Sequence, residues 1–181
     1  MSWQNPTCRL APAPDHFERS DQRRDPGATR LCGVPVMQLR AFGAEFEKYV
    51  HPWMEALRAY WRQRPHPGEK LGAALDGTDP QGLKFVDREL MLKIPRPPLN
   101  VFHRFLTQDD EEDEEFNKAL LLAVHLHHEY RTADEERADD VDGAIALAPP
   151  ALACLAHGAG RSVTIESDHL PAHLLARRSE D

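Results

Sequence analysis

The sequence has 181 residues, with 22 Lys and Arg against 30 Asp and Glu, and a formal net charge of −8 at pH 7. This length suits one domain with a sizeable hydrophobic core. With 41% hydrophobic and 29% charged residues, composition excludes a chain disordered throughout. The acidic balance excludes a general nucleic-acid binder and attraction to an anionic membrane. It permits a basic protein partner.

The negative charge is concentrated in the last part of the chain. Residues 1–30 carry five basic and four acidic side chains, and residues 31–108 carry eleven and eight, so both parts are slightly positive. Residues 109–181 carry six basic and eighteen acidic side chains, a net charge of −12. One run alone contributes −7: Asp109, Asp110, Glu111, Glu112, Asp113, Glu114 and Glu115.

The sequence contains no window that approaches the roughly 18 apolar residues of a membrane span. The stretch from Met1 to Pro14 lacks the apolar core of a signal peptide. The three cysteines (Cys8, Cys32 and Cys154) are too widely spaced to indicate a metal site or a disulfide framework. We therefore expect a cytoplasmic protein with no cofactor and no direct contact with nucleic acid or membrane.

Residues 1–30 contain four prolines and no amphipathic period, which predicts an irregular, flexible N-terminal segment. Residues 31–178 are expected to form a single domain. Its predicted fold class is mainly α, with at most one short strand near the C-terminus.

The first predicted helix spans residues 36–61, where apolar side chains recur at the steps of one helical face. Pro52 has no amide hydrogen to donate, so a kink or two consecutive helices are expected there. The aromatic side chains from Phe42 to Trp61 are expected to face the core.

The middle of the chain predicts short helices separated by prolines. One is expected over residues 69–75. Asp79 followed by Pro80 is typical of an N-cap and a first helical residue, and predicts a helix that continues to Ile94. A further helix is expected over residues 99–106. Three prolines are expected to separate the two: Pro95, Pro97 and Pro98.

The strongest later helical pattern spans residues 112–131. A helix of small residues is predicted over residues 144–157, with an interruption at Pro149 and Pro150. Residues 161–166 alternate weakly and are β-branched, which predicts the one short strand. A last short helix is expected after it.

Three side chains of the helix over residues 112–131 share one face, because they are three and four residues apart: His125, His128 and Glu129. Such residues hold a metal ion when further ligands converge on them, which leaves a metal-dependent hydrolase as an alternative. The pattern is not His-Glu-x-x-His, and no other ligand stands at an indicative spacing. We therefore expect surface or core roles for these histidines.

The run of residues 109–115 has two interpretations. Carboxylates in the first turn of a helix interact favourably with the helix dipole, and the surplus charges then form a solvated loop. Alternatively, the run attracts a cationic partner. A second acidic group follows the same helix and has the same two interpretations: Asp134, Glu135, Glu136, Asp139, Asp140 and Asp142.

A further indication comes from segments that occur together in a characteristic order and spacing. They are Leu31–Pro35, Gly43–Tyr49, Pro52–Trp61, Leu75–Pro80, Glu89–Ile94, Phe116–Leu120, His128–Tyr130, Thr132–Arg137, Gly143–Ala156 and Ile165–Pro171. Taken together they resemble the immunity protein 49 family of bacterial toxin–immunity systems, over about four-fifths of the chain.

The resemblance implies a helical, non-catalytic protein that binds and blocks a cognate toxin. A toxin that acts on nucleic acid presents a basic surface, which an acidic partner can reach rapidly and occupy. Tight binding also needs a desolvated anchor among the charges. The predicted contact residues are Asp109, Asp110, Glu111, Glu112, Asp113, Glu114, Glu115, Tyr130, Asp134, Glu135, Glu136, Asp139 and Asp140. A helical adaptor unrelated to toxins is the alternative.

Overall fold

A computed structural model describes residues 45–107, 113–141, 145–165 and 167. Its helices are α3 (Val50–Trp61), α4 (Pro67–Asp76), α5 (Arg88–Lys93), α6 (Arg96–Thr107), α7 (Asp113–Arg131), α8 (Glu135–Ala138) and α9 (Ala148–Gly158), with a 3-10 turn η2 (Pro80–Gly82). The described residues include no β-strand, so the mainly α prediction is confirmed. The predicted N-terminal segment 1–30 and the last short helix lie outside the described residues.

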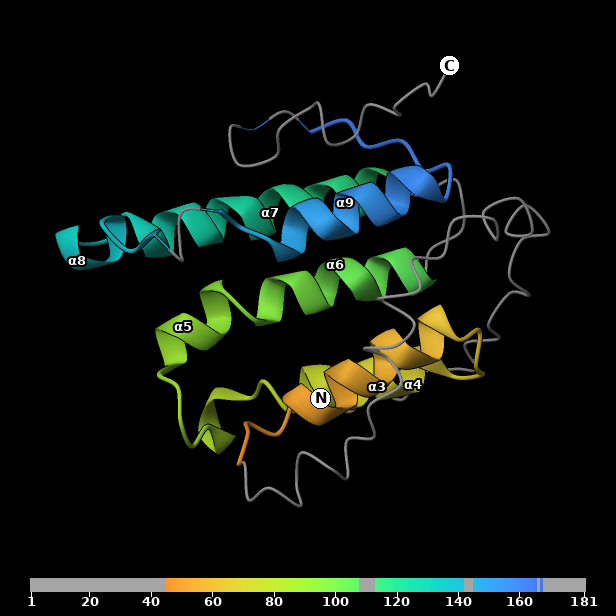
Figure 1. Ribbon diagram of the computed structural model, residues 1–181, viewed down its shortest axis with the longest axis horizontal. Helices are drawn as coiled ribbons and strands as arrows, with labels where there is room; N and C mark the ends of the chain where they lie inside the picture. The colour runs from red at the N-terminus through yellow and green to blue at the C-terminus, as the bar shows by residue number, and fades with distance from the viewer. Residues whose placement is uncertain (1–44, 108–112, 142–144, 166, 168–181) are drawn as a thin grey trace, which may run out of the picture.

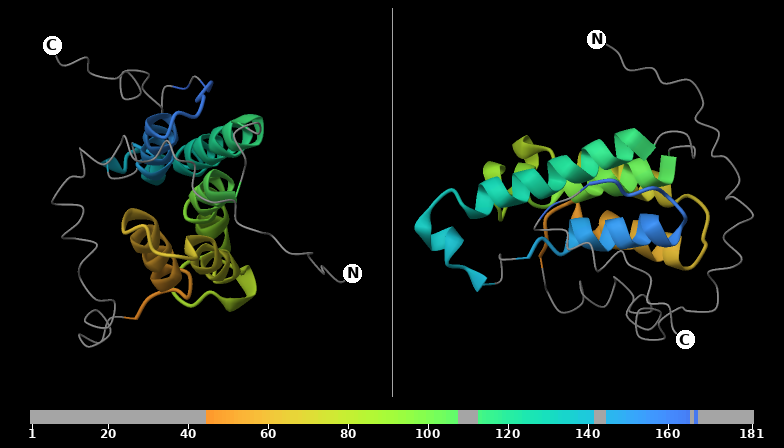
Figure 2. Two further views of the ribbon diagram at one scale, coloured as in Figure 1. Left: turned by 90° about the vertical axis from the view of Figure 1, so that its right-hand side faces the viewer. Right: turned by 90° about the horizontal axis from the view of Figure 1, so that it is seen from above.

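Helix α6 lies at the centre of the molecule. It packs against α4 and α5 and also against α7 and α9, while α3 packs on α4. Figure 1 shows these helices in layers, with α3 and α4 below α6 and with α7 and α9 above it. The short helix α8 follows α7 at one end of the molecule, where Figure 2 shows it projecting beyond the layers.

An aromatic cluster fills the space between α3, α6 and α7. Phe102 is fully buried, and the rings of Trp53 and Tyr60 meet it edge-on at centroid distances of 5.3 and 5.6 Å. Phe105 stacks on Phe102 at 6.0 Å and meets Phe116 of α7 at 6.5 Å. Such pairs each add about 0.5–1.5 kcal/mol beyond the burial of their area. The cluster therefore ties three helices together.

This cluster confirms the core role of Trp53 and Tyr60, which contact the buried core. The prediction was wrong for Phe46 and Trp61, which are 40% and 43% exposed. Phe46 precedes α3 and packs its ring against His51 instead. Phe42 lies outside the described residues.

Prolines begin the helices of this protein rather than interrupt them. Pro52 is in the first turn of α3, and the first turns of α6 and α9 each contain a proline pair. The first N–H groups of a helix have no partner within it, so proline is tolerated there. The kink predicted at Pro52 and the interruption predicted at Pro149 and Pro150 were therefore wrong. The alternative at Pro52, two consecutive helices, involves residues 36–44, which lie outside the described residues. Likewise, α6 begins at Arg96, so Pro95 separates it from α5 as predicted, whereas Pro97 and Pro98 are in its first turn.

The segment before α5 is not the continuous helix that the Asp79 cap predicts. Asp79 does cap η2, since its Oδ1 accepts the N–H of Gln81 at 3.0 Å, but the turn ends after three residues. A separate cap, Asp87, begins α5. Between them, the N–H groups of residues 84–86 all donate to Oε1 of Glu47, at 2.5 to 3.2 Å. Amides that converge on one oxygen cannot continue a helix.

Glu47 fixes the chain before α3 to this segment. The side chain is 5% exposed. Burial alone would raise its pKa, but the three backbone donors outweigh burial and hold the pKa below the usual value. The chain also approaches closely at Gly77, where a Cβ atom would lie 2.7 Å from the backbone nitrogen of Tyr49. Only glycine permits this contact without a shift of the backbone.

Candidate functional site

The first acidic group consists of residues 109–115, and its last three residues form the first turn of α7. Asp109, Asp110, Glu111 and Glu112 lie outside the described residues. The remaining three carboxylates all have intramolecular partners. Lys118 pairs with Glu114 at 2.8 Å and with Glu115 at 3.0 Å. Hydrogen bonding to Lys118 lowers the pKa of Glu114.

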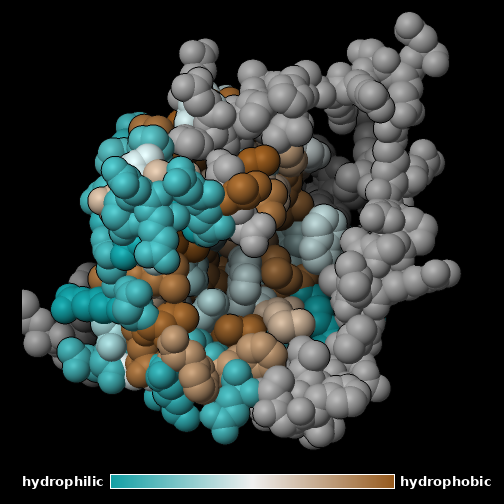
Figure 3. Space-filling view, turned by 60° about the vertical axis from the view of Figure 1, so that its left-hand side comes forward, coloured by the Kyte–Doolittle hydropathy of each residue, from teal (hydrophilic) through white to brown (hydrophobic). Residues whose placement is uncertain are grey.

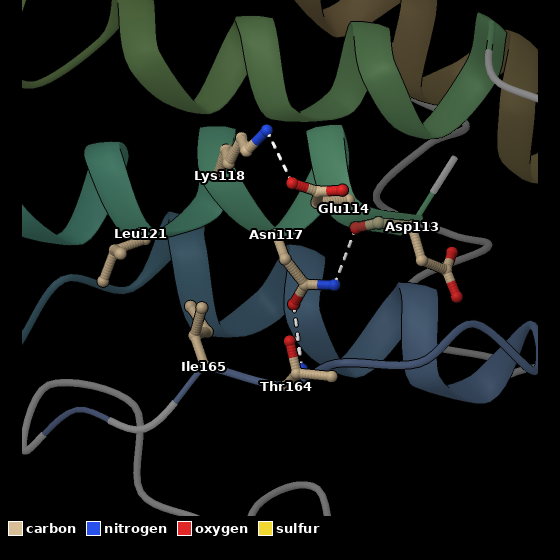
Figure 4. Close-up of a pocket in the computed structure, with 7 residues that line it drawn as sticks. All are labelled: Asp113, Glu114, Asn117, Lys118, Leu121, Thr164 and Ile165. Atoms are coloured by element: carbon tan, nitrogen blue, oxygen red, sulfur yellow. Dashed lines mark hydrogen bonds and ion pairs between the residues drawn. The ribbon is translucent and has the colours of Figure 1, made fainter. Parts of the chain in front are cut away.

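The third carboxylate of this end, Asp113, binds the backbone of the segment after α9. Its Oδ2 accepts the N–H of Ser162 at 2.8 Å. One turn further along α7, Asn117 donates to the carbonyl of Ser162 at 2.8 Å. Asn117 also accepts the N–H of Thr164 at 2.9 Å, as Figure 4 shows. Residues 161–165 therefore pair with side chains of α7, and the strand predicted over residues 161–166 does not form in its described part.

An open hollow of about 380 Å³ lies over this contact. It is lined by Asp113, Glu114, Asn117, Lys118, Leu121, Thr164 and Ile165. Asn117 is committed to the backbone of residues 162 and 164, and Lys118 is paired with Glu114 and Glu115. The polar groups of the hollow thus serve the fold, and their arrangement does not indicate a catalytic site.

The second acidic group meets the C-terminal end of α7, where α5 and α8 come together. Lys93 of α5 lies 2.9 Å from both Glu89 and Glu129. Lys93 donates hydrogen bonds to Glu129 and Glu89, which raise the pKa of Lys93, and the bonds that Glu89 accepts from Lys93 and Arg137 lower the pKa of Glu89. The other carboxylate oxygen of Glu89 lies 3.2 Å from Arg137 of α8. Charged pairs thus connect three helices.

Tyr130 lies beneath this network. It is 9% exposed, and the guanidinium of Arg137 lies 4.1 Å from its ring centroid. A cation over an aromatic face contributes about 0.5–1 kcal/mol at an exposed site and more when it is desolvated. Tyr130 therefore supports Arg137 within the molecule rather than presenting its own ring to solvent.

Asp142 lies outside the described residues, and the other remaining acidic residues of this end divide into two kinds. Asp134 caps α8, since its Oδ1 accepts the N–H of Arg137 at 2.8 Å, and Asp140 lies 2.6 Å from Arg131. Three others are exposed and form no side-chain hydrogen bond or ion pair within the described chain: Glu135, Glu136 and Asp139. These three are the carboxylates that remain available to a partner. Figure 3 turns this end towards the viewer and shows hydrophilic residues gathered beside hydrophobic ones.

The described members of the two acidic groups lie towards opposite ends of α7. Helix α7 has 19 residues, and its ends are about 27 Å apart at 1.5 Å per residue. Each group must therefore be considered separately.

A metal site formed by His125, His128 and Glu129 finds no support in the described part of the chain. His125 and His128 are exposed on α7, His127 is buried, and Glu129 is paired with Lys93. Among the described residues, no three His, Cys, Asp or Glu side chains are placed to hold a metal ion. Burial raises the pKa of the Cys154 thiol, which keeps it protonated rather than nucleophilic.

The sequence interpretation missed the cations of the C-terminal end. The spacing of Glu89 and Lys93, four residues apart, is a recognisable signal for a pair on one helix. The contacts from Lys93 to Glu129 and from Arg137 to Glu89 join residues 36 and 48 positions apart, and no local pattern reveals them.

Comparison with known protein families identifies the class of this protein. The model of the family described as Immunity protein 49 matches residues 21–174, and the chain belongs to this family. The match begins at residue 21, ten residues before the domain boundary that the sequence analysis expects at Leu31. The position of that boundary stays a prediction. Neither the curated proteins nor the solved structures gave a match. In the described part of the chain, no helix has both the length and the apolar character needed to cross a membrane.

The structure brings together three of the segments that carry the resemblance. Glu89–Ile94 includes most of α5, His128–Tyr130 lies in the last turn of α7, and Thr132–Arg137 leads into α8. The charged pairs described above join all three.

Proposed function

We propose that this protein binds a cognate toxin in the cytoplasm and neutralises it by occlusion, without catalysis. Membership of the immunity protein 49 family supports a toxin as the partner. The observation that carries the choice of surface is the group of exposed carboxylates at the C-terminal end of α7: Glu135, Glu136 and Asp139. Residues 129–141 carry six acidic and two basic side chains, a net charge of −4.

The position of this charge supports a role in binding. The C-terminal end of a helix carries partial negative charge, so carboxylates beside the end of α7 oppose its dipole, and the single turn of α8, in which Glu135 and Glu136 stand, has too small a dipole to offset this. Arg131 and Arg137 offset part of this effect, but they leave an excess of negative charge. Surface charge that does not favour folding is expected to have a role in binding a partner. A basic toxin surface is the complementary one.

Apolar side chains beside the charges supply the other component of an interface. Val141 is 84% exposed, and Ile145 and Leu147 are 62% and 74% exposed. Exposed large apolar side chains next to polar residues are typical of protein-binding surfaces. They are better placed for direct contact than Tyr130, which acts through Arg137.

The first group, residues 109–115, is proposed to accelerate association rather than to form the contact. Its described members are occupied within the molecule by Lys118 and Ser162. Long-range attraction needs only net charge, whereas a tight contact needs side chains free to bind.

Co-expression with a candidate toxin gene encoded beside this one tests the proposal. We expect growth to be restored and the two proteins to elute as one complex in gel filtration. Continued killing, with no complex, would contradict the proposal.

Two charge-matched double variants then locate the contact. Glu135→Gln with Glu136→Gln should weaken toxin binding roughly tenfold, mainly through faster dissociation. Glu114→Gln with Glu115→Gln removes the same charge and should slow association only a fewfold, with a flatter dependence on salt. Binding kinetics at several salt concentrations measure both. Equal effects of the two pairs on dissociation would refute the assignment of the contact to α8.

A further inference from the structure

The conformation of α8 depends on contacts outside the helix. Residues Glu135–Ala138 make a single turn, closed by hydrogen bonds from Ala138 to Asp134 and from Asp139 to Glu135, each 3.0 Å long. The first turn of a helix is unfavourable in isolation, because several residues are ordered for each hydrogen bond gained. A four-residue helix therefore needs tertiary contacts to persist.

Arg137 provides the first of these contacts. Its guanidinium lies 4.1 Å from the ring centroid of Tyr130, and its Nη1 lies 3.2 Å from Glu89 of α5. Its Nε lies 3.2 Å from Asp134, the cap of α8. One planar side chain thus contacts α5, α7 and the start of α8, and it is only partly exposed.

Arg131 provides the second contact, at the C-terminal end of α8. Its Nη1 lies 2.6 Å from Oδ2 of Asp140. Asp140 directly follows Asp139, so this pair fixes the chain where α8 ends. The exposed residues Glu135, Glu136 and Asp139 lie between the two fixed points, and the exposed Val141 follows them.

We infer that Arg137 and Arg131 are positioning residues that hold α8 as a preformed docking surface for the toxin. This inference rests on the proposed function. The surface consists of Glu135, Glu136 and Asp139, with the apolar Val141 beside them. It fits a toxin surface on which lysine or arginine side chains border an apolar side chain. The two arginines order α8 before the partner arrives. The entropy cost of ordering α8 therefore does not weaken the binding of the toxin.

The sign of the charge separates positioning from simple attraction. Arg137→Gln makes the protein more negative, so attraction alone predicts tighter binding to a basic toxin. Positioning predicts the opposite, because α8 loses its contact with α5 and α7. Lys118→Gln is the matched control, since it adds the same negative charge at the other end of α7 and leaves α8 untouched.

The experiment measures the affinity of these variants for the catalytically inactivated product of a candidate toxin gene encoded beside this one. Arg137→Gln should weaken binding roughly tenfold, and Arg131→Gln should weaken it by a smaller factor. Lys118→Gln should leave binding unchanged or slightly tighter. Arg137→Lys should recover part of the loss, because lysine keeps the charge without the planar contact to Tyr130. Arg131→Gln carries the same test if Arg137→Gln fails to fold.

Amide hydrogen exchange provides a measurement that does not need the toxin. Arg137→Gln should raise exchange at residues 138 and 139, while the amides of α6 and the centre of α7 keep their protection. The inference is overturned if Arg137→Gln binds as tightly as Lys118→Gln, or if exchange in α8 does not change. If the wild-type protein itself does not bind the toxin, the proposed function fails, and the exchange measurement still decides whether the arginines order α8.

Discussion

The two ends of α7 carry the same kind of charge in opposite structural situations. At the N-terminal end, Asp113 binds the backbone of Ser162, and Lys118 neutralises two glutamates. At the C-terminal end, Glu135, Glu136 and Asp139 have no such partners within the described chain.

The difference shows that charge density alone does not identify a binding surface. Carboxylates in the first turn of the 19-residue α7 interact favourably with its dipole, whereas Glu135 and Glu136 begin only the four-residue α8 and follow the C-terminal end of α7. The described acids of the first end therefore have a role in the fold, whereas the exposed acids of the second end have no partner in the described chain, which is why we propose that they contact the toxin.

The largest expected effect tests the structural role of the N-terminal end. Asn117→Ala removes both bonds to the 162–164 backbone and leaves those groups without their partner at a site where Asn117 is buried. We expect a loss of about 2–3 kcal/mol in the free energy of unfolding, or a fall in Tm of roughly 4–12 °C. Thermal unfolding measures it. Lys118→Ala, on the exposed face, should change stability by no more than about 0.5 kcal/mol. A comparably small effect of Asn117→Ala would show that water replaces these bonds.

A buried carboxylate away from α7 gives an intermediate effect and extends the comparison to pH. Glu47 accepts three backbone N–H bonds, and its pKa in the folded protein lies below the value of 4.5 taken for an unperturbed glutamate. Its contribution is therefore fully present above that value and is lost as the pH falls through the lower folded pKa. Glu47→Gln should reduce the free energy of unfolding by about 1–2 kcal/mol at pH 7.

Thermal unfolding of the wild type and Glu47→Gln between pH 7 and pH 3 measures this dependence. The difference between the two proteins should shrink as the pH falls below 4.5. A difference that stays constant over this range would mean that the charge of Glu47 does not provide the stabilisation.

The smallest expected effect sharpens the comparison of the two ends directly. Glu114→Gln with Glu115→Gln should lower the free energy of unfolding slightly, because it removes two charges from the first turn of α7 and their pairs with Lys118. Glu135→Gln with Glu136→Gln should change it by a smaller amount. Urea denaturation of both proteins checks this order. The reverse order would remove the distinction between a structural and a functional end.

The sequence predicted elements whose signals are local. Periodicity located α7, and the Asp79-Pro80 pair located the cap of η2. The prolines were misjudged because a pattern does not tell a first helical turn from an interior one. Pro52 is compatible with a first turn or with a kinked interior, and the sequence does not show that α3 begins at Val50.

The contacts that define the candidate site depend on tertiary structure. Asn117 looks like an ordinary polar residue in a helix, and its partners are 45 and 47 residues away. Arg137 looks like a single cation that interrupts an acidic stretch, and its role emerges only when α5 and α7 lie beside it. Acidic composition therefore predicted a charged surface, but the fold was needed to show which carboxylates are already in use.

The length of α7 has a consequence for the electrostatic field that an approaching partner encounters. Its ends are about 27 Å apart, whereas the Debye screening length is about 8 Å at 0.15 M salt and about 30 Å at 0.01 M. At physiological ionic strength, an approaching protein therefore meets two separate negative centres, each felt only at close range. In dilute buffer the fields of the two centres overlap. The difference between their separate attractions for a basic partner therefore becomes smaller as salt is removed.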